Sequence, residues 1–407
     1  MGNLTTEQRV LLELLAGEIS GETRLDQADL KSADWTELLS EAKAQAVLLM
    51  ASEAAGKYRD CISNYPDWEK AAIAGHALNL RAAYNGQQLS RVMQGRPFII
   101  IKGMVSASYY PNPIERSFGD IDFLIEPSQM SEIEALLSEN GYKRANNTEH
   151  CHHVGFKKDD AYLEMHFEIP SIPYGKQGKA VRDFIAGAVK QPVTVNFDGW
   201  SFQAPADIYH GLIILLHMQG HMVSEGLGLR HICDWACYLQ KTENMPFWDR
   251  LLDLFKEIGI FRYAQVISKI SSMYFHINCP KWAESADEEL CRDVMNDVLT
   301  GGNFGRKDVQ RAKSGILISE NGKCGTRRGK VSNLFWTLHH STKTMYPIVK
   351  KHPILYPFLD IYRVFLYLVR TAKGERSSLV RLVPAANQRK SLYDRLHLFE
   401  TENNNGK

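Results

Sequence analysis

The chain has 407 residues, of which 44% are hydrophobic and 23% are charged, with a formal net charge of +1. This length predicts two or three domains, because domains usually hold about 100–200 residues. The apolar fraction excludes a chain that is disordered throughout. The ordinary content of glycine and proline excludes collagen-like and proline-rich fibrous proteins.

The charge is unevenly distributed along the chain. Residues 301–407 contain 20 Lys and Arg against 7 Asp and Glu, a net charge of +13, so the preceding part, with 28 basic and 40 acidic side chains, carries −12. Such a basic segment is typical of proteins that bind an anionic partner, such as nucleic acid, phospholipid headgroups or an acidic protein face. A solvated basic surface without a partner is the alternative.

The seven cysteines have irregular spacing and include no Cys-x-x-Cys pair. Reduced thiols are therefore expected. The first twenty residues lack the basic region of a signal peptide, and no run of 18 uncharged apolar residues occurs. We expect a cytoplasmic, bacterial protein without a transmembrane segment.

The first hundred residues have the apolar spacing of helices. Helices are predicted at residues 11–15, 35–54 and 66–93. Pro66 suits the first turn of the third helix. Leu78 and Leu80 follow the apolar spacing of that helix, so we expect them to be packed.

From residue 96 onward strands alternate with short helices, until a helical pattern returns at residue 206. The predicted strands are 98–101, 119–125, 161–169, 193–197 and 200–202. The predicted helices are 104–110, 128–141, 206–222, 229–239, 246–274 and 356–369. Asp198-Gly199 separates two of the strands and predicts a β-hairpin.

Asp120 and Asp122 lie two residues apart on the predicted strand 119–125, so both carboxylates point to the same face. Ile121 and Phe123 point to the other face, into the core. Adjacent carboxylates repel each other, and a divalent cation between them removes that repulsion. Mg²⁺ takes few protein carboxylates and leaves other positions for water and phosphate. The pattern therefore indicates metal-assisted phosphoryl or nucleotidyl transfer.

The predicted strand 161–169 alternates in the same way. Glu164, His166 and Glu168 share one face of its pleat, and the residues between them are apolar. A third carboxylate is needed for a second metal ion or for a general base. Glu164 can supply it if the two strands are neighbours.

The order of these motifs resembles the nucleotidyltransferase superfamily of DNA polymerase β type, and more closely a bacterial group of uncharacterised nucleotidyltransferases. The shared features are an apolar strand, Lys102-Gly103, a short helix, Arg116, Asp120-Ile121-Asp122, Gly141-Tyr142 and the acid-x-His of Glu164 and His166. The resemblance covers roughly residues 35–240. It implies an α+β core with a mixed sheet, two Mg²⁺ ions and an NTP.

The resemblance also implies site residues. Asp120 and Asp122 match the metal-binding pair, and Glu164 matches the third acid, where Asp is the commoner residue. Gly103 matches the glycine that lets the backbone approach the triphosphate, although Met104 follows it where Ser or Gly is usual. The catalytic and metal-binding residues are expected to be Asp120, Asp122 and Glu164. The nucleotide-binding residues are expected to be Lys102, Gly103, Arg116, His166 and Arg230.

The implied reaction is Mg²⁺-dependent transfer of a nucleoside monophosphate from an NTP to a hydroxyl of a small molecule, sugar or peptide. Two alternatives stay open: a toxin–antitoxin-type enzyme that modifies a protein or tRNA, and a non-catalytic nucleotide-binding module. The predicted regions are a helical N-terminal region at 1–95, the nucleotidyltransferase core at 96–204, a helical domain at 205–300 and a basic helical C-terminal region at 301–407.

Two groups of histidines can be interpreted as metal sites. Residues 150–153 hold three histidines and a cysteine, but the paired cysteines of structural zinc sites are missing, which favours a polar loop near the cleft. His217 and His221 have the spacing of a zinc-binding helix, without the glutamate of zinc proteases. Arg230 and Asp234 either pair along their helix or bind substrate.

The predicted helix 356–369 is aromatic and lies in the basic segment. We expect Phe358, Tyr362 and Phe365 to pack on the body of the protein, because aromatic stripes usually belong to a core. The alternative is a helix that lies on a membrane surface.

Overall fold

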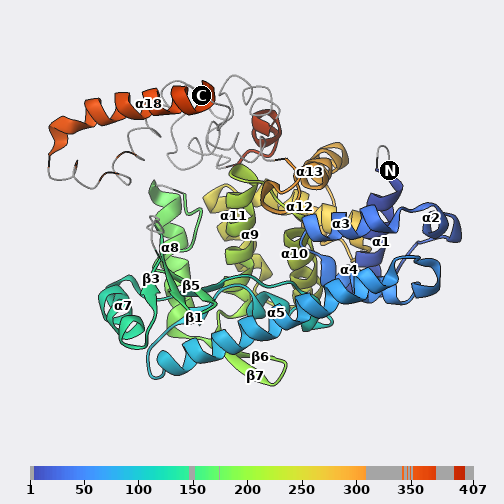
Figure 1. The fold of residues 1–407 in the computed structure, drawn as a ribbon, viewed down its shortest axis with the longest axis horizontal. Helices are drawn as coiled ribbons and strands as arrows, with labels where there is room; N and C mark the ends of the chain where they lie inside the picture. Colours follow the sequence, from blue (N-terminus) through green and yellow to red (C-terminus); the bar gives the residue numbers. More distant parts are fainter. Residues whose placement is uncertain are drawn as a thin grey trace.

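The computed structural model describes residues 4–145, 152–173, 175–308, 352–372 and 389–398, together with residues 342, 346 and 349. The fold is α+β, as predicted: helices flank a five-stranded mixed sheet and a separate hairpin (Figure 1). Most of the basic segment lies outside the described residues. The four predicted regions remain a prediction.

The strands are β1 (Ile99–Ile100), β2 (Ile121–Leu124), β3 (Lys143–Arg144), β4 (His153–Lys158), β5 (Ala161–His166), β6 (Val193–Phe197) and β7 (Trp200–Ala204). The α-helices are α1 (Thr6–Ile19), α2 (Gln27–Ser32), α3 (Trp35–Ala44), α4 (Leu48–Gly56), α5 (Tyr65–Val92), α6 (Met104–Ala107), α7 (Met130–Glu139), α8 (Gly175–Lys190), α9 (Asp207–Val223), α10 (Leu229–Thr242), α11 (Trp248–Ile258), α12 (Phe261–Phe275), α13 (Glu288–Gly301) and α18 (Tyr356–Ala372). Short 3₁₀ helices include η2 (Pro113–Glu115) and η5 (Asn303–Gly305).

The main sheet has the strand order β1-β2-β5-β4-β3. β2 and β5 run parallel, and the other neighbouring pairs are antiparallel, which gives the mixed sheet that the resemblance implied. β3 and β4 were not predicted. β4 begins at His153, in the segment that we expected to be a polar loop.

The hairpin β6–β7 forms where the sequence predicts it. Its turn consists of Asp198 and Gly199, whose φ angles are 45° and 81°. Positive φ at both central residues is the requirement of a type I′ turn, which Asp-Gly satisfies.

Two apolar cores share the main sheet. The larger core joins α1, α3 and α4 to the helices α9–α13, and the smaller core surrounds the sheet, α7 and the hairpin. Strand residues alternate between the cores: Ile99 and Leu124 belong to the larger core, whereas Ile100 and Phe123 belong to the smaller one. The face of β2 that carries Asp122 therefore lies toward the helical body.

The predicted helix 246–274 is interrupted at Gly259, so that prediction was wrong. Gly259 has a φ of 76° and ends α11, and α12 begins two residues later. Glycine adopts this left-handed conformation without strain and is the usual residue after a helix end.

The burial predicted for the helix α5 was wrong at two positions. Leu78 and Leu80 are exposed, and the buried side chains near them are Asn79 and Ala83. The apolar spacing identified the helix but not its buried face. That face includes the polar residue Asn79, whose side chain forms hydrogen bonds to the backbone of residues 114–118.

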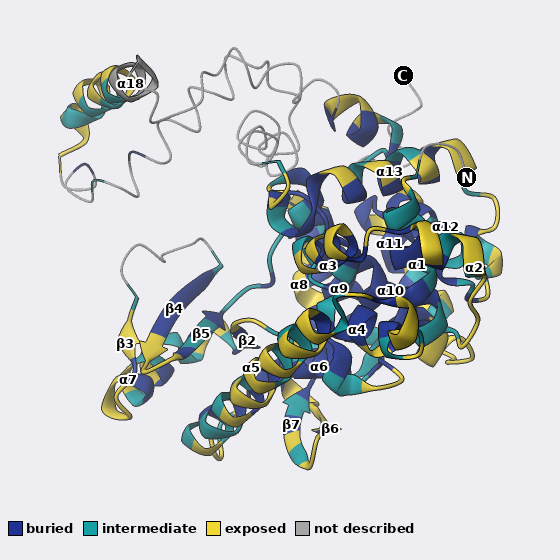
Figure 2. Ribbon diagram, turned by 45° about the vertical axis from the view of Figure 1, so that its right-hand side comes forward, coloured by how far each residue is buried: buried dark blue, intermediate teal, exposed yellow. Residues whose placement is uncertain are grey.

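The packing predicted for the C-terminal aromatic helix was also wrong. In α18 the side chains of Phe358, Tyr362 and Phe365 are exposed, with exposed fractions of 69%, 49% and 60% (Figure 2). Among the described helices none is long and apolar enough to cross a membrane.

Candidate active site

The parallel pairing of β2 and β5 places the predicted acids side by side. Asp122 lies opposite Glu164 in the register, and Asp120 directly precedes β2. Because their apolar neighbours Ile121 and Phe123 point into the smaller core, the carboxylates point to the other face of the sheet. Asp122 is buried, Glu164 is half-buried and Asp120 is exposed at the edge of the site.

Two cationic or polar side chains contact the central carboxylate. Lys102 donates a hydrogen bond from Nζ to Asp122 Oδ1 at 2.8 Å, and His166 Nε2 lies 2.9 Å from the same oxygen. His166 Nε2 is also 3.5 Å from Glu164 Oε2. Lys102, Asp122 and His166 thus form a buried polar group that fixes the orientation of Asp122.

The charges at the site explain its pKa shifts. Burial raises the pKa of Asp122, but Lys102 and His166 together hold it well below the ordinary value. The negative charges of Asp122 and Glu164 raise the pKa of Asp120 to about 6. Burial lowers the pKa of His166, but its hydrogen bonds to Asp122 and Glu164 raise it overall. The negative charge that these acids concentrate is the condition under which a divalent cation binds.

The donor atoms of this group fit a hard cation. Ligand atoms of Asp122, Glu164 and His166 lie within 4.8 Å of one another. With Asp120, the set offers three carboxylates, and oxygen ligands are the preference of Mg²⁺. Ligand atoms of Asp122, Glu164 and His166 are therefore close enough together for one metal ion, and Asp120 lines the same cavity.

The Lys102-Gly103 turn connects β1 to α6. Gly103 has a φ of 60°, a conformation that favours glycine, and a Cβ built on it would meet no atom within 4 Å. The backbone at this turn is thus open to close approach by a ligand. The Gly103 carbonyl accepts a hydrogen bond from Arg116 Nη1 at 3.2 Å.

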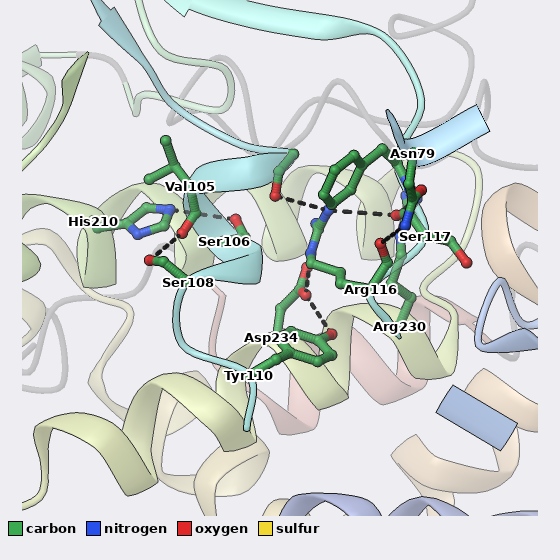
Figure 3. A network of polar contacts seen from close by, with 12 residues as sticks. Asn79, Val105, Ser106, Ser108, Tyr110, Arg116, Ser117, His210, Arg230 and Asp234 are labelled. Carbon is green, nitrogen blue, oxygen red and sulfur yellow. Dashed lines mark hydrogen bonds and ion pairs between the residues drawn. The ribbon is translucent and has the colours of Figure 1, made fainter. Parts of the chain in front are cut away.

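Arg116 is buried in an ion pair that the sequence did not predict. Its Nε and Nη2 donate to the two carboxylate oxygens of Asp234 on α10, at 2.7 and 2.8 Å, and Tyr110 donates to the same carboxylate at 2.6 Å (Figure 3). Burial lowers the pKa of Arg116, but Asp234 raises it overall. The guanidinium thus connects α10 to the Gly103 turn.

Asn79 is a second residue that the sequence analysis missed. Its side chain donates to the carbonyls of Ile114 and Arg116 at 2.8 Å each and accepts from the Phe118 N–H at 2.9 Å (Figure 3). It therefore holds the segment that leads into the Asp120 motif. A polar residue in the middle of an apolar helix face was the only sequence signal for this role.

All eight residues predicted to form the site line one cavity of about 610 Å³ between the sheet and the helices α9 and α10. They are Lys102, Gly103, Arg116, Asp120, Asp122, Glu164, His166 and Arg230. Their individual roles stay predictions. The cavity also has residues from α9, α10 and η5, namely His217, Gln219, His221, His231 and Phe304.

Arg230 does not make the predicted pair along its own helix, because the ion pair of Asp234 is with Arg116. Its Nη1 donates to the Ser117 carbonyl at 3.4 Å, and its guanidinium lies over the Phe304 ring at 5.6 Å. Burial lowers the pKa of Arg230, and the nearby Arg116 charge lowers it further. Arg230 therefore adds positive charge to the cavity wall.

The histidines near the acids are close to one another. The rings of His152 and His166 stack with a centroid separation of 5.7 Å, and His153 Nε2 lies 3.8 Å from Glu164 Oε1. His150 and Cys151 of the predicted cluster lie outside the described residues. The described members thus belong to the same site as the acids.

Residues 31–276 match a family described as uncharacterised nucleotidyltransferase. The match covers more than half of the 407 residues, so the chain belongs to this family. No curated protein and no solved structure matched the chain. Membership confirms the closer of the two resemblances and supports nucleotidyl transfer, with an NTP as substrate, as the general class of activity. The DNA polymerase β-type superfamily and the bacterial origin stay predictions.

Proposed function

We propose that this protein transfers a nucleoside monophosphate from an NTP to a hydroxyl of a small molecule, sugar or peptide, with Mg²⁺ bound by Asp120, Asp122 and Glu164. One observation carries the proposal: the β2–β5 register sets Asp122 opposite Glu164, beside Asp120 and the Gly103 turn, in one cavity. Membership in a nucleotidyltransferase family supports the reaction class.

When bound, Mg²⁺ neutralises phosphate charge and polarises the α-phosphate. The side chains of the chain supply the remaining parts of the reaction. Lys102 Nζ faces the cavity and donates to a phosphate oxygen, and the open backbone at Gly103 allows the triphosphate to approach. His166 holds the Asp122 carboxylate in position through its 2.9 Å contact.

The transfer forms one bond and breaks one. The acceptor hydroxyl oxygen attacks the α-phosphorus, and a Glu164 carboxylate oxygen accepts the proton that the hydroxyl loses. The bond between the α-phosphorus and the bridging oxygen breaks, and its electron pair leaves with pyrophosphate. Arg116 acts as a positioning residue in this scheme, because its described contacts are with Asp234 and the Gly103 and Ser117 carbonyls.

Calorimetric titration of ATP, GTP, CTP and UTP tests the proposal, with and without Mg²⁺. We expect one NTP to bind in a metal-dependent way to the wild type. The Asp120→Asn/Asp122→Asn double variant should lose that binding and the release of pyrophosphate. Asp198→Asn is the matched control, because Asp198 lies in the β6–β7 turn and not at the cavity.

The alternatives predict other results. Nucleotide binding that persists without Mg²⁺ and in the double variant would indicate a non-catalytic module. Metal-dependent labelling of tRNA or of a partner protein, with no transfer to low-molecular-weight hydroxyls, would indicate the toxin–antitoxin type.

A further inference from the structure

The part of the cavity wall formed by α9 and α10 carries three histidines and an arginine, and Glu225 lies beside His221. His217 and His221 come from α9, and Arg230 and His231 come from α10. His217 Nε2 lies 3.0 Å from His221 Nε2, and ligand atoms of the three histidines lie within 4.8 Å of one another. The Phe304 ring packs on His221 and His231 with centroid separations of 4.6 and 5.6 Å. These side chains therefore pack against one another and do not form a loose surface patch.

Several of these groups have unused hydrogen-bonding capacity. Among the described residues, Arg230 Nε, His231 Nε2 and both polar side-chain atoms of Gln219 are buried without a hydrogen-bond partner. His231 is 2% exposed and Gln219 is fully buried. Each unpartnered buried group costs about 1–3 kcal/mol, so native proteins seldom keep one without a ligand or water. Three such residues on one cavity wall indicate a ligand that accepts hydrogen bonds.

The protonation pattern of the histidines follows from their neighbours. Gly228 N–H donates to His231 Nδ1 at 3.4 Å, so the proton of the neutral His231 ring lies on Nε2. His217 Nε2 and His221 Nε2 lie 3.0 Å apart and share one hydrogen bond, so one of these two rings carries a proton on Nε2. The unpartnered ring nitrogen of His231 is therefore an N–H group and not a lone pair.

Three clustered imidazoles are also a ligand set for zinc. The surrounding charge favours an anion instead. Burial lowers the pKa of all three histidines, to about 3 for His221, and the positive charges of Lys102 and Arg230 lower it further. A bound cation would add to this positive charge, whereas a bound anion offsets it.

We propose that Arg230 and His231 bind the terminal phosphates of the NTP and retain the pyrophosphate as it leaves. The inference rests on the proposed function. Lys102 pairs with Asp122, and it lines the same cavity as the carboxylates and the imidazoles. The carboxylates then take the α-phosphate. On the wall formed by α9 and α10, Arg230 Nε–H and His231 Nε2–H donate to the oxygens that gain charge when the bond to the α-phosphorus breaks.

Inorganic pyrophosphate is the direct probe, titrated calorimetrically into the full chain in excess chelator so that no divalent cation is present. We expect one site in the wild type and a dissociation constant at least about tenfold higher in Arg230→Gln and in His231→Phe. Asp120→Asn/Asp122→Asn should keep the site, because it removes negative charge from the cavity. Arg306→Gln is the matched control, since Arg306 is exposed and does not line the cavity.

A phosphorylated acceptor offers the same oxygens, so tripolyphosphate and glycerol 3-phosphate are titrated in parallel. We expect tripolyphosphate to bind at least as tightly as pyrophosphate, and the monoester to bind at least about tenfold more weakly, because it has one phosphate group and less negative charge. Equal binding of the monoester contradicts an assignment to the terminal phosphates.

The inference is wrong if pyrophosphate does not bind the wild type, or binds Arg230→Gln and His231→Phe as tightly. A tetrahedral Co²⁺ absorption that His217→Ala removes, without pyrophosphate binding, would assign the cluster to a metal. Circular dichroism checks that each variant folds, and Arg230→Lys, which keeps the charge, should bind with intermediate affinity. Failure of the proposed function gives a different result: pyrophosphate still binds, but no NTP binds in a metal-dependent way.

Discussion

Arg116 and Asp234 form a buried ion pair in the wall of the cavity. Both are buried, and the pair joins α10 to the turn at Gly103 and to the segment before Asp120. Breaking a buried pair leaves one charge without compensation, which usually costs more than the pair itself contributes. Single residues of this kind therefore determine whether the cavity exists at all.

Asp234→Asn should destabilise the protein by about 3–5 kcal/mol, because the buried Arg116 guanidinium loses its counter-charge. Urea unfolding measures the free energy of unfolding. Asp183→Asn is the control: Asp183 forms an exposed ion pair with Lys179, and its loss should cost less than about 1 kcal/mol. Equal effects of the two substitutions would show that the Arg116 pair is not structurally important.

Glu115 should make the stability fall as the pH rises. Burial raises its pKa to about 7 from 4.5, despite the hydrogen bond from Asn112, so the folded protein binds this proton more tightly than the unfolded chain. Stability is therefore lost between pH 4.5 and 7, by up to about 3 kcal/mol.

Glu115→Gln removes this loss. We expect the variant to be more stable than the wild type at pH 8 and about equal at pH 4, as measured by thermal unfolding across that range. Glu139→Gln, at an exposed position, should leave the pH profile unchanged. Parallel profiles for wild type and Glu115→Gln would contradict the assignment.

At the scale of elements, the position of α9 against α10 determines the width of the cavity. Tyr238 of α10 donates to the Asp207 carbonyl at the start of α9 at 2.9 Å, and its phenol lies against Gly211. A Cβ on Gly211 would overlap the Tyr238 ring. The glycine is therefore needed for close approach of the two helices.

Gly211→Ala should push α9 away from α10 and destabilise the protein by about 1–3 kcal/mol, the usual cost of overpacking. The melting temperature measures this loss. Gly17→Ala in α1 is the control, because a Cβ there makes only an ordinary contact of 3.5 Å with Thr23. A Gly211→Ala variant as stable as Gly17→Ala would show that the helices can separate freely.

The elements themselves were largely predictable, and their partners were not. Asp122 and Glu164 were found because the two-residue repeat of a strand fixes the face on which a side chain lies. Arg116 and Asp234 are 118 positions apart in the sequence. Arg230, on the same helix as Asp234, was an equally good candidate for its partner. In α18 the apolar residues indicated a helix, but hydrophobicity does not show whether another surface covers it.

At the scale of the whole molecule, the cavity lies between two apolar cores that share one sheet. Its walls come from segments as far apart in the sequence as the Lys102 turn and η5. A ligand that binds between the cores should therefore stabilise the whole fold and not only one part of it.

Mg²⁺ and the NTP identified by titration, at about 100 times the dissociation constant, should raise the free energy of unfolding by about 2.7 kcal/mol. Thermal unfolding measured by tryptophan fluorescence and by circular dichroism should shift by the same amount. Asp120→Asn/Asp122→Asn should show no shift. A shift seen by only one probe would mean that the two cores unfold separately.

The helix α5 crosses both cores. Trp68 near its start packs in the larger core, and Ala83 and Leu89 near its end pack in the smaller one. α5 is a continuous helix of 28 residues, about 42 Å long, and it connects the two cores rigidly. We expect this helix to hold the two cores at a fixed separation, so substrates should enter a site of constant width, and their association rates should not depend on a closing motion.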